Sequence, residues 1–386
     1  MIKYFAYLKG DRAIWVITLI LLAFSLVSVY SFVPILVKIE GGSPFKYLFK
    51  HLIYVIIGFI AMFWLHRKDP LYFSRFARLI FYASVALLLF TFFFGTKVND
   101  AGRWIRIPFV GLTFQSSDFA KLGLIVYLSR LLVKKKDKFD SWKEGFGPVM
   151  FPIIVICGLI FKDNFSTAFL LFCISFLVLF LGKFPISKMI ATIAGGVALA
   201  ALVVGLHLSL PQLNLLPRYE TWVNRITNKL ENDKDVTANA QAMNAELAIY
   251  NGKFFGQGVG DGKLKEYLPE AYADFYYSSF VEEFGSLSAI ILVFLYSILL
   301  FRIIRIALKS DKLFETYLCV GIGILLLTQA TVNMMVCTGI FPVTGQNMPL
   351  LAMGGSALIM TCVAIGMIQS IAYRQQKNNK IESEAS

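Results

Sequence analysis

Three carboxylates recur at a regular spacing in a polar stretch of an otherwise apolar chain. Glu266, Glu270 and Asp274 are each four residues apart, and an apolar segment begins just after them. Carboxylates at a boundary between water and hydrocarbon are costly and usually mark a functional site. If a helix starts at Pro269, Glu270 and Asp274 share one face, and one of them suits a general base. The alternative is a solvated loop that needs polar residues only to stay in water.

A second polar group, upstream, has the residue types that bind anions. It consists of Arg103 and the segment from Gln115 to Lys121, which includes Asp118. Asp118 and Lys121 are three residues apart on one helical face, so they can form a structural ion pair. Beside Arg103 they can equally form a cationic pocket for a phosphate, because guanidinium offers a two-pronged donor and ammonium a point charge. The spacing leaves both interpretations open.

Further candidate binding residues are spread over the chain. They are Asp163 in a short polar turn, Arg218 in the long polar segment, Asn333 in an apolar run, and Thr344 within Phe341–Leu350. Proline and glycine break the backbone between the last two apolar runs, and such backbone is tolerated at membrane depth only where it lines a cavity. We therefore expect Thr344 to lie beside a cavity.

Two other motifs have structural interpretations. The glycines of Gly256–Gly262 do not match a dinucleotide-binding fingerprint, and we expect them to let the backbone approach a substrate or another helix. Ser279 and Glu282 have the spacing of a capping box. That pattern predicts that Glu282 and Glu283 are helix-cap and helix-dipole residues rather than catalytic ones.

Composition places the chain among membrane proteins. It has 386 residues, of which 57% are hydrophobic and 16% charged, with a mean hydropathy of +0.68. Soluble domains carry about 25% charged residues. The five cysteines lie in apolar runs without a CxxC pair, and the three histidines are scattered, so neither a disulfide framework nor a metal site is predicted.

The fold class predicted is all-α, a polytopic membrane protein with ten transmembrane helices and one large extracytoplasmic loop. The first span is predicted to be an anchor rather than a removed signal peptide. Residues 1–374 form the membrane domain, with the large loop at about 210–277, and residues 375–386 form a disordered cytoplasmic tail. The expected spans are 13–35, 51–66, 78–95, 116–133, 148–161, 167–182, 189–209, 278–301, 316–339 and 351–373.

Lysine and arginine predict the orientation of these spans. They concentrate in alternate short loops, such as 134–147 and 302–315, and in both tails. Short loops rich in basic residues stay in the cytoplasm. Both termini are therefore expected inside and the large loop outside. The net charge of +13 reflects this topology and an attraction to anionic lipid. Its dispersal over many segments disfavours nucleic-acid binding.

In order and spacing, four motifs resemble the SEDS family (shape, elongation, division and sporulation) of ten-helix peptidoglycan glycosyltransferases. The resemblance covers nearly the whole chain. The family's GxRRWI…QPSE…K is similar to Gly102–Ile105, Gln115–Asp118 and Lys121, and its QPDxGT to Lys162–Thr167. Its GxGxG…YLPEAHTDF…EE resembles Gly256–Gly260, Tyr267–Phe275 and Glu282–Glu283, and its PTG…LP…GGSS resembles Val343–Gly345, Met348–Leu350 and Gly354–Ala357.

Some positions depart from the family pattern. Tyr272 and Ala273 replace its His-Thr, one arginine of RRW is absent, and Phe161-Lys162 replaces Gln-Pro. The position of the family's catalytic aspartate is acidic, as Asp274. The Leu-Pro-Glu-Ala sequence and the residues Lys265–Tyr267 resemble the division branch of the family more than the elongation branch.

The resemblance implies polymerisation of lipid II at the outer face of the cytoplasmic membrane. Asp274 would be the general base, and Arg103, Lys121 and Arg218 would bind the diphosphate. No cofactor is implied with certainty, although a divalent cation (Mg²⁺ or Mn²⁺) could bridge the diphosphate. The implied partners are the growing lipid-linked glycan strand, a class B penicillin-binding protein (a transpeptidase) and other divisome membrane proteins at the septum. Two further hypotheses are a lipid II flippase and a non-catalytic scaffold for a transpeptidase.

Overall fold

The computed structural model describes residues 8–98, 101–106, 112–209, 223, 236–268 and 270–385. Its long helices are α2 (Arg12–Glu40), α3 (Pro44–Leu65), α4 (Pro70–Phe94), α5 (Ser116–Lys134), α6 (Gly147–Phe161), α7 (Phe165–Leu181), α8 (Ile186–Ser209), α10 (Val236–Asn251), α11 (Tyr276–Leu308), α12 (Leu313–Cys337) and α13 (Gly355–Ala385). Short helical turns occupy Lys136–Lys138, Trp142–Phe146 and Leu264–Tyr267.

The predicted polytopic helical membrane fold is confirmed. Each of the ten expected spans falls on one helix. Among the described residues, eight helices are long and apolar enough to cross a membrane. Helix α7 is apolar but has 17 residues, and α5 carries charged residues near both ends. The number ten for membrane-crossing helices therefore stays a prediction.

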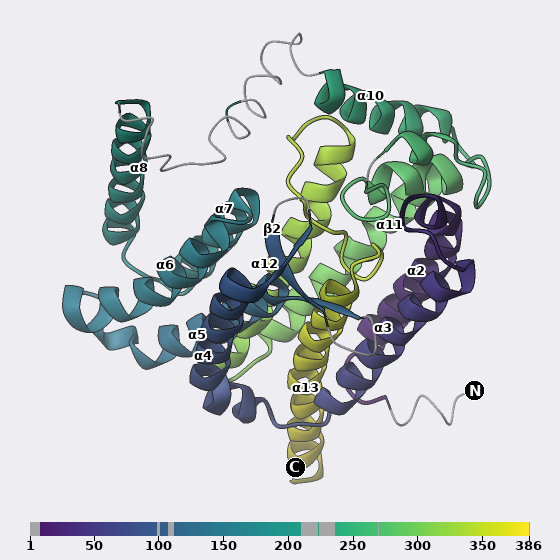
Figure 1. Ribbon diagram of the computed structural model, residues 1–386. Coiled ribbons are helices and arrows are strands. Elements are labelled where there is room, and N and C mark those ends of the chain that lie inside the picture. The colour runs from purple at the N-terminus through teal and green to yellow at the C-terminus, as the bar shows by residue number, and fades with distance from the viewer. Residues whose placement is uncertain are drawn as a thin grey trace.

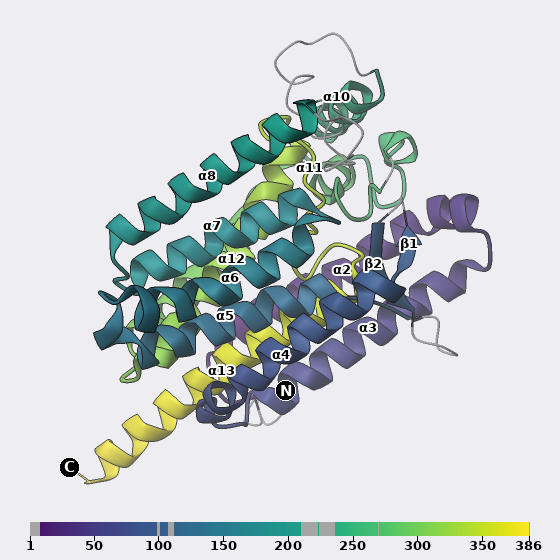
Figure 2. The same cartoon turned by 60° about the vertical axis from the view of Figure 1, so that its left-hand side comes forward.

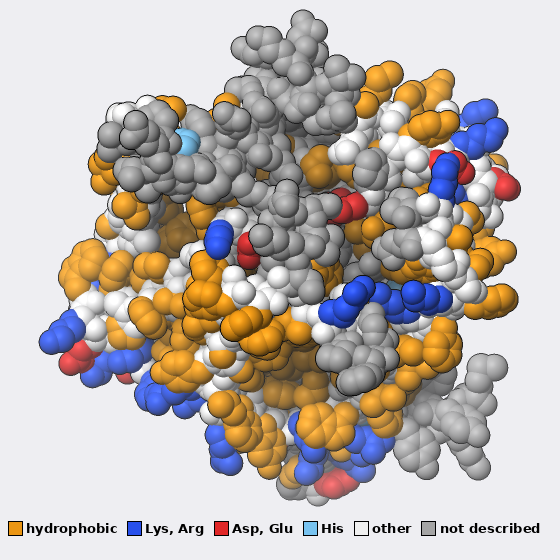
Figure 3. Space-filling model, in the orientation of Figure 1, with side chains coloured by type: hydrophobic (Ala, Val, Ile, Leu, Met, Phe, Trp, Pro, Cys, Tyr) orange, Lys and Arg blue, Asp and Glu red, His pale blue; other side chains and the backbone are white. Residues whose placement is uncertain are grey.

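The helices form a bundle with the loops gathered at its two ends (Figures 1 and 2). The most extensive contacts join α3 to α13, α4 to α5 and α11 to α12. Helix α8 lies at the edge of the bundle, and its side chains are almost all exposed. Figure 3 shows a broad hydrophobic surface on one face, with Lys and Arg gathered along its lower edge and further ones in the upper half. Such a surface suits contact with lipid.

A small sheet lies at one end of the bundle and was not predicted. Strands β1 (Thr96–Val98), β2 (Ala101–Arg106) and β3 (Thr113–Gln115) pair antiparallel in that order. The Tyr54 hydroxyl on α3 accepts from Thr113 N at 2.8 Å and donates to Thr113 O at 3.0 Å. These bonds hold β3 against the bundle just before α5 begins at Ser116.

Helix α11 is interrupted at Gly285, where φ is +79°. Beyond the break, Ser286 N donates to Lys253 O at 2.9 Å and Leu287 N donates to Phe254 O at 3.2 Å. In an unbroken helix these donors would bond to carbonyls four residues earlier. The loop after α10 thus supplies the acceptors that the break removes.

The carbonyls released by the break are also satisfied by this loop. Glu282 O accepts from Gln257 N at 2.9 Å, and Glu283 O accepts from Gly258 N at 3.1 Å. Gly256 has φ of +83° and lies directly against the α11 backbone. The expected close approach of the glycine-rich loop to a helix is confirmed.

The side chains of Glu282 and Glu283 fix the same loop. Glu282 Oε1 accepts from the backbone of Lys263 at 3.0 Å and of Leu264 at 3.1 Å. Glu283 Oε1 pairs with Lys265 Nζ at 2.6 Å, and both side chains are buried. The capping-box prediction is wrong, because α11 begins at Tyr276 and Glu282 bonds to a distant loop instead of its own helix end.

Two further expectations differ from the structure. Residues 375–385 continue α13, contrary to the predicted disordered tail, and the Gln376 side chain bonds to Gly10. Pro269 lies outside the described residues, and residues 270–275 form turns in place of the expected helix. Glu270 and Asp274 therefore do not share a helical face.

The contact between Gly256 and α11 gives a test of how the loop is held. A Cβ at Gly256 would lie 2.7 Å from Gly285 N, whereas a Cβ at Gly260, with φ of +92°, meets nothing within 4 Å. Both Gly→Ala changes should cost about 1–2 kcal/mol through the left-handed backbone. Gly256→Ala should cost about 1–3 kcal/mol more through overpacking. Equal shifts of the melting temperature in detergent for the two variants would contradict this account.

Candidate active site

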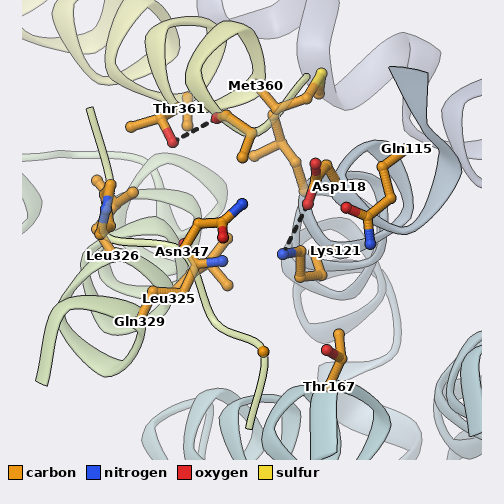
Figure 4. A pocket seen from close by; sticks show the side chains of 15 residues that line it. Gln115, Asp118, Lys121, Thr167, Leu325, Leu326, Gln329, Asn347, Met360 and Thr361 are labelled. Atoms are coloured by element: carbon orange, nitrogen blue, oxygen red, sulfur yellow. Dashed lines mark hydrogen bonds and ion pairs between the residues drawn. The ribbon is translucent and has the colours of Figure 1, made fainter. Parts of the chain in front are cut away.

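A cavity of about 40 Å³ lies among four helices and the segment that joins α12 to α13 (Figure 4). Its polar lining includes Gln115 from β3, Asp118 and Lys121 from α5, Thr167 from α7, Gln329 from α12, Asn347 from the joining segment and Thr361 from α13. The apolar lining includes Leu325, Leu326 and Met360. The cavity has room for a few water-sized groups and offers both amide and charged partners.

Lys121 supplies a positive charge to the cavity wall. Its Nζ lies 2.9 Å from Asp118 Oδ1, and both side chains are buried. Asp118 Oδ2 accepts from the Ser356 hydroxyl at 2.7 Å, which ties α5 to α13. The structural ion pair is therefore present, and the same lysine lines the cavity. An ammonium has three donors, so Lys121 can hold Asp118 and still contact an anion.

Asp274 lies just behind the wall of this cavity, in the turn before α11. A Cβ placed on Gly345 would be 3.7 Å from Asp274 Oδ2 and 3.6 Å from Asn164 Nδ2. Gly345 itself lines the cavity and has φ of +69°. The missing side chain at Gly345 thus lets the half-buried Asp274 carboxylate approach the cavity lining.

Asn333 holds the backbone on both sides of this contact. Its Nδ2 donates to Asp274 O at 3.0 Å, to Ala273 O at 3.3 Å and to Gln346 O at 2.8 Å. Its Oδ1 accepts from Tyr277 N at 3.4 Å. This buried amide bonds only to backbone, so Asn333 holds the turn that carries Asp274, and its predicted contact with substrate stays a prediction.

Further hydrogen bonds hold the segments around Asp274 and the cavity in place. Gln346 Nε2 donates to Thr167 Oγ1 at 2.7 Å, which joins the segment after α12 to α7. Asn164 Oδ1 accepts from Thr167 N at 3.0 Å and caps α7. Met353 N donates to Tyr272 O at 2.9 Å. Tyr272, which replaces the family's histidine, packs its side chain against the core.

The structure brings together only part of the predicted site. Gln115 and Lys121 line the cavity, and Asp274 lies beside it. Glu266 is exposed and lies 3.9 Å from Lys38. Glu270, with φ of +58°, contributes its carbonyl to the turn before Asp274.

Four other predicted residues remain outside the cavity lining or cannot be placed. Asp163 is half-buried in the turn between α6 and α7, next to Asn164. Thr344 is buried beside Gly345, and its hydroxyl has no hydrogen-bond partner among the described residues. The backbone of Arg103 belongs to β2, but its side chain lies outside the described part, as does the whole of Arg218.

Sequence reasoning missed several polar groups at the cavity. Gln329 and Asn347 line it, and Asn164 lies behind it. Gln329 gave one usable signal, since an amide in an apolar span usually faces the bundle interior. Asn347 and Asn164 gave none, because turn residues of this type are common in any loop.

Among the described residues, no group of three or more His, Cys, Asp or Glu side chains could hold a metal ion. Asp118 is engaged with Lys121 and Ser356, so the cavity offers no free set of oxygen ligands of the kind that Mg²⁺ requires. The described part of the site does not fit a protein-bound metal.

Comparison with known proteins identifies the family of the chain. A sequence model of the FtsW/RodA/SpoVE family, described as cell cycle protein, matches residues 11–377. The chain belongs to this family. A protein of Geobacter sp. (strain M18) named probable peptidoglycan glycosyltransferase FtsW is 32% identical over 95% of this chain and 97% of its own length. The protein of that name from Coxiella burnetii is 29% identical over 95% and 97%.

Solved structures share the fold of this FtsW/RodA/SpoVE family member. A chain from a peptidoglycan synthase complex, whose title concerns coordination of polymerization and crosslinking, has a TM-score of 0.72 at 22% identity and covers 95% of this chain and 98% of its own. RodA of Thermus thermophilus has a TM-score of 0.65 at 21% identity, with coverage of 95% and 97%. At these identities the likeness supports the fold alone.

The bonds of Asn333 predict a specific loss of stability. Asn333→Leu removes the amide donor from the carbonyls of 273, 274 and 346, of which the last is buried, at a cost of about 1–3 kcal/mol. Gln329→Leu is the matched control, because Gln329 makes no hydrogen bond among the described residues. Asn333→Leu should lower the melting temperature in detergent and speed amide exchange around Asp274. A smaller effect than that of Gln329→Leu would contradict the positioning role.

Proposed function

We propose that this chain is a peptidoglycan glycosyltransferase that polymerises lipid II at the outer face of the cytoplasmic membrane, in the division branch of its family. The relatives named FtsW support the activity and the branch. The observation that carries the proposal is the approach of Asp274 to a buried cavity lined by Lys121, across Gly345, which has no side chain. A cation thus lines the cavity, and a carboxylate that could act as a base lies beside it.

The two groups suit opposite ends of a glycosyl transfer. A hydroxyl of the acceptor sugar attacks the anomeric carbon of the donor, and the bond from that carbon to the diphosphate oxygen breaks. Asp274 takes the hydroxyl proton, since a sugar hydroxyl needs a base as the new bond forms. Lys121 stabilises the negative charge that develops on the lipid diphosphate as it leaves. Arg103 and Arg218 are proposed to add to this positive charge.

The cavity is smaller than a disaccharide, so the sugars and the lipid chains lie outside it. Only the reacting groups need to reach the lining. This arrangement fits a substrate that remains in the membrane while its head group enters the protein from the side. A divalent cation that bridges the diphosphate would come with the substrate, and the steps above do not depend on it.

The proposed setting is the division septum, with a class B penicillin-binding protein as partner. Both termini are proposed to lie in the cytoplasm, because the basic residues of the short loops favour that side. A flippase or a scaffold would need the bundle but not the carboxylate of Asp274.

The role of Asp274 can be tested with a nearly isosteric change. Asp274→Asn keeps the shape but removes the basicity, and loss of a general base typically costs about 10²- to 10⁴-fold in rate. Glycan synthesis from purified lipid II, with the transpeptidase partner present, is the measurement. Asp261→Asn is the matched control, because Asp261 is exposed in the same outer loop. Unchanged synthesis by Asp274→Asn would favour the flippase or scaffold.

A double substitution separates the two roles of Lys121. Lys121→Met alone leaves Asp118 as an unpaired buried charge, which costs about 3–5 kcal/mol of stability. Adding Asp118→Asn removes that charge and should restore the melting temperature. If the ammonium binds the leaving group, glycan synthesis by the double variant stays at least about tenfold below wild type. If the double variant regains both stability and glycan synthesis, the Lys121–Asp118 pair has only a structural role.

A further inference from the structure

A second hollow, of about 440 Å³, lies at the end of the bundle opposite Asp274. Asp274 immediately precedes the first residues of α11, whereas Arg302 lies near the last ones. The hollow is lined by Arg302, by Gln376 of α13 and by the segment Leu8–Arg12, which leads into α2. No part of the proposed glycosyl transfer uses these residues.

The charge of the hollow is positive. Lys9, Arg12 and Arg302 supply three cations, and Asp11 supplies one carboxylate, which leaves two positive charges. Arg302 forms an ion pair with Asp11, in which Nε lies 2.8 Å and Nη2 lies 2.6 Å from Oδ2. Arg12 is exposed and has no ion pair or hydrogen bond to its side chain among the described residues. The Asp11 carboxylate is thus already paired with Arg302, while the Arg12 side chain is available to bind an anion.

Three side chains, two from α13 and one from α2, hold the backbone that presents Lys9 and Arg12. Asp11 N donates to Gln369 Oε1 at 2.7 Å, and Gln369 Nε2 donates to Asp11 O at 2.9 Å. Gln376 makes the same two-way exchange with Gly10. Trp15 Nε1 donates to Lys9 O at 3.0 Å. A cationic hollow whose backbone is fixed in this way loses little conformational entropy when an anion binds.

Lys9 also has N–H groups that can donate to a ligand. Lys9 Nζ donates to the Tyr373 hydroxyl at 2.9 Å and lies over the Tyr373 ring. One of its three N–H groups is used by that hydroxyl, so two remain. Lys9 and Arg12 together can therefore contact two oxygens of one phosphate.

Exposed apolar side chains continue from both arginines toward the middle of the membrane. Val16 follows Arg12 by one turn of α2 and is 42% exposed, and Ile298 precedes Arg302 by one turn of α11 and is 44% exposed. Residues four apart on a helix share a face. The surface thus offers a ligand the cationic hollow at one end and two exposed apolar helix faces that lead away from it.

We propose that this hollow binds the phosphate of an anionic phospholipid in the leaflet opposite the candidate active site. The phosphodiester contacts Lys9 and Arg12, while the acyl chains lie along the Val16 and Ile298 faces. Basic pockets between membrane helices are suited to anionic lipid head groups. Inorganic phosphate offers the same anion without acyl chains, so it is the competing occupant.

The test uses the full chain purified in detergent and measures lipid retention by native mass spectrometry. Wild type should retain phosphatidylglycerol in preference to phosphatidylcholine. Lys9→Gln with Arg12→Gln should lower that retention about 10- to 30-fold. Arg305→Gln with Lys309→Gln is the matched control, because it removes two exposed cations near the same end of α11, outside the hollow.

The outcomes separate the alternatives. The control pair should retain phosphatidylglycerol as wild type does, and thermal melting in detergent should show that both double variants are folded. Equal retention by Lys9→Gln/Arg12→Gln and wild type would overturn the proposal, as would an equal loss in the control pair. Stabilisation of wild type by millimolar inorganic phosphate without any preference for phosphatidylglycerol over phosphatidylcholine would also overturn it, in favour of a soluble anion.

Discussion

Non-helical backbone inside a membrane bundle must find its hydrogen-bond partners within the protein, because hydrocarbon offers none. The candidate site is built from such backbone: the turn that carries Asp274 and the segment that joins α12 to α13. Asn333 meets this requirement for both, since its single amide group bonds to carbonyls at 273, 274 and 346. The position of the Asp274 carboxylate follows from this arrangement.

The same requirement explains the break in α11. A helix interrupted at Gly285 leaves donors on one side and acceptors on the other, and the loop after α10 satisfies both. Glu282 and Glu283 add side-chain bonds to Lys263, Leu264 and Lys265 in the same loop. The loop is thereby fixed to α11 shortly before the chain reaches Asp274. A buried ion pair is costly unless its partners are well bonded, and Ser31 on α2 also donates to Glu283 and accepts from Lys265.

The two ends of the bundle differ in how charge is used. Near Asp274 the cation Lys121 is buried beside Asp118, where a low dielectric constant and weak screening by salt strengthen its interaction with a nearby charge. At the opposite end Lys9 and Arg12 are exposed, and their attraction for anions falls with salt. The first arrangement suits stabilisation of a charge that develops during a reaction. The second suits reversible contact with a charged membrane surface.

The sequence by itself determined the class of fold and the approximate position of the helices, because a run of about 20 apolar residues has few alternatives to a membrane helix. It also singled out Asp274, Lys121 and Gln115, since charged and polar groups next to such runs are costly. The predictions that depended on local pattern alone were less successful. Glu282 fitted a capping box, yet it bonds to a loop about twenty residues earlier in the chain.

Only the tertiary structure decided which polar residues meet. Asn333 holds the backbone of Asp274, and Glu266 lies at the surface although it shares its spacing with Asp274. The small sheet, the continuation of α13 through 375–385 and the approach of Gly345 to Asp274 were likewise invisible in the sequence. These features depend on hydrogen bonds between segments far apart in the chain. Local periodicity records the face that a helix buries, but it does not record the partner that the face will meet.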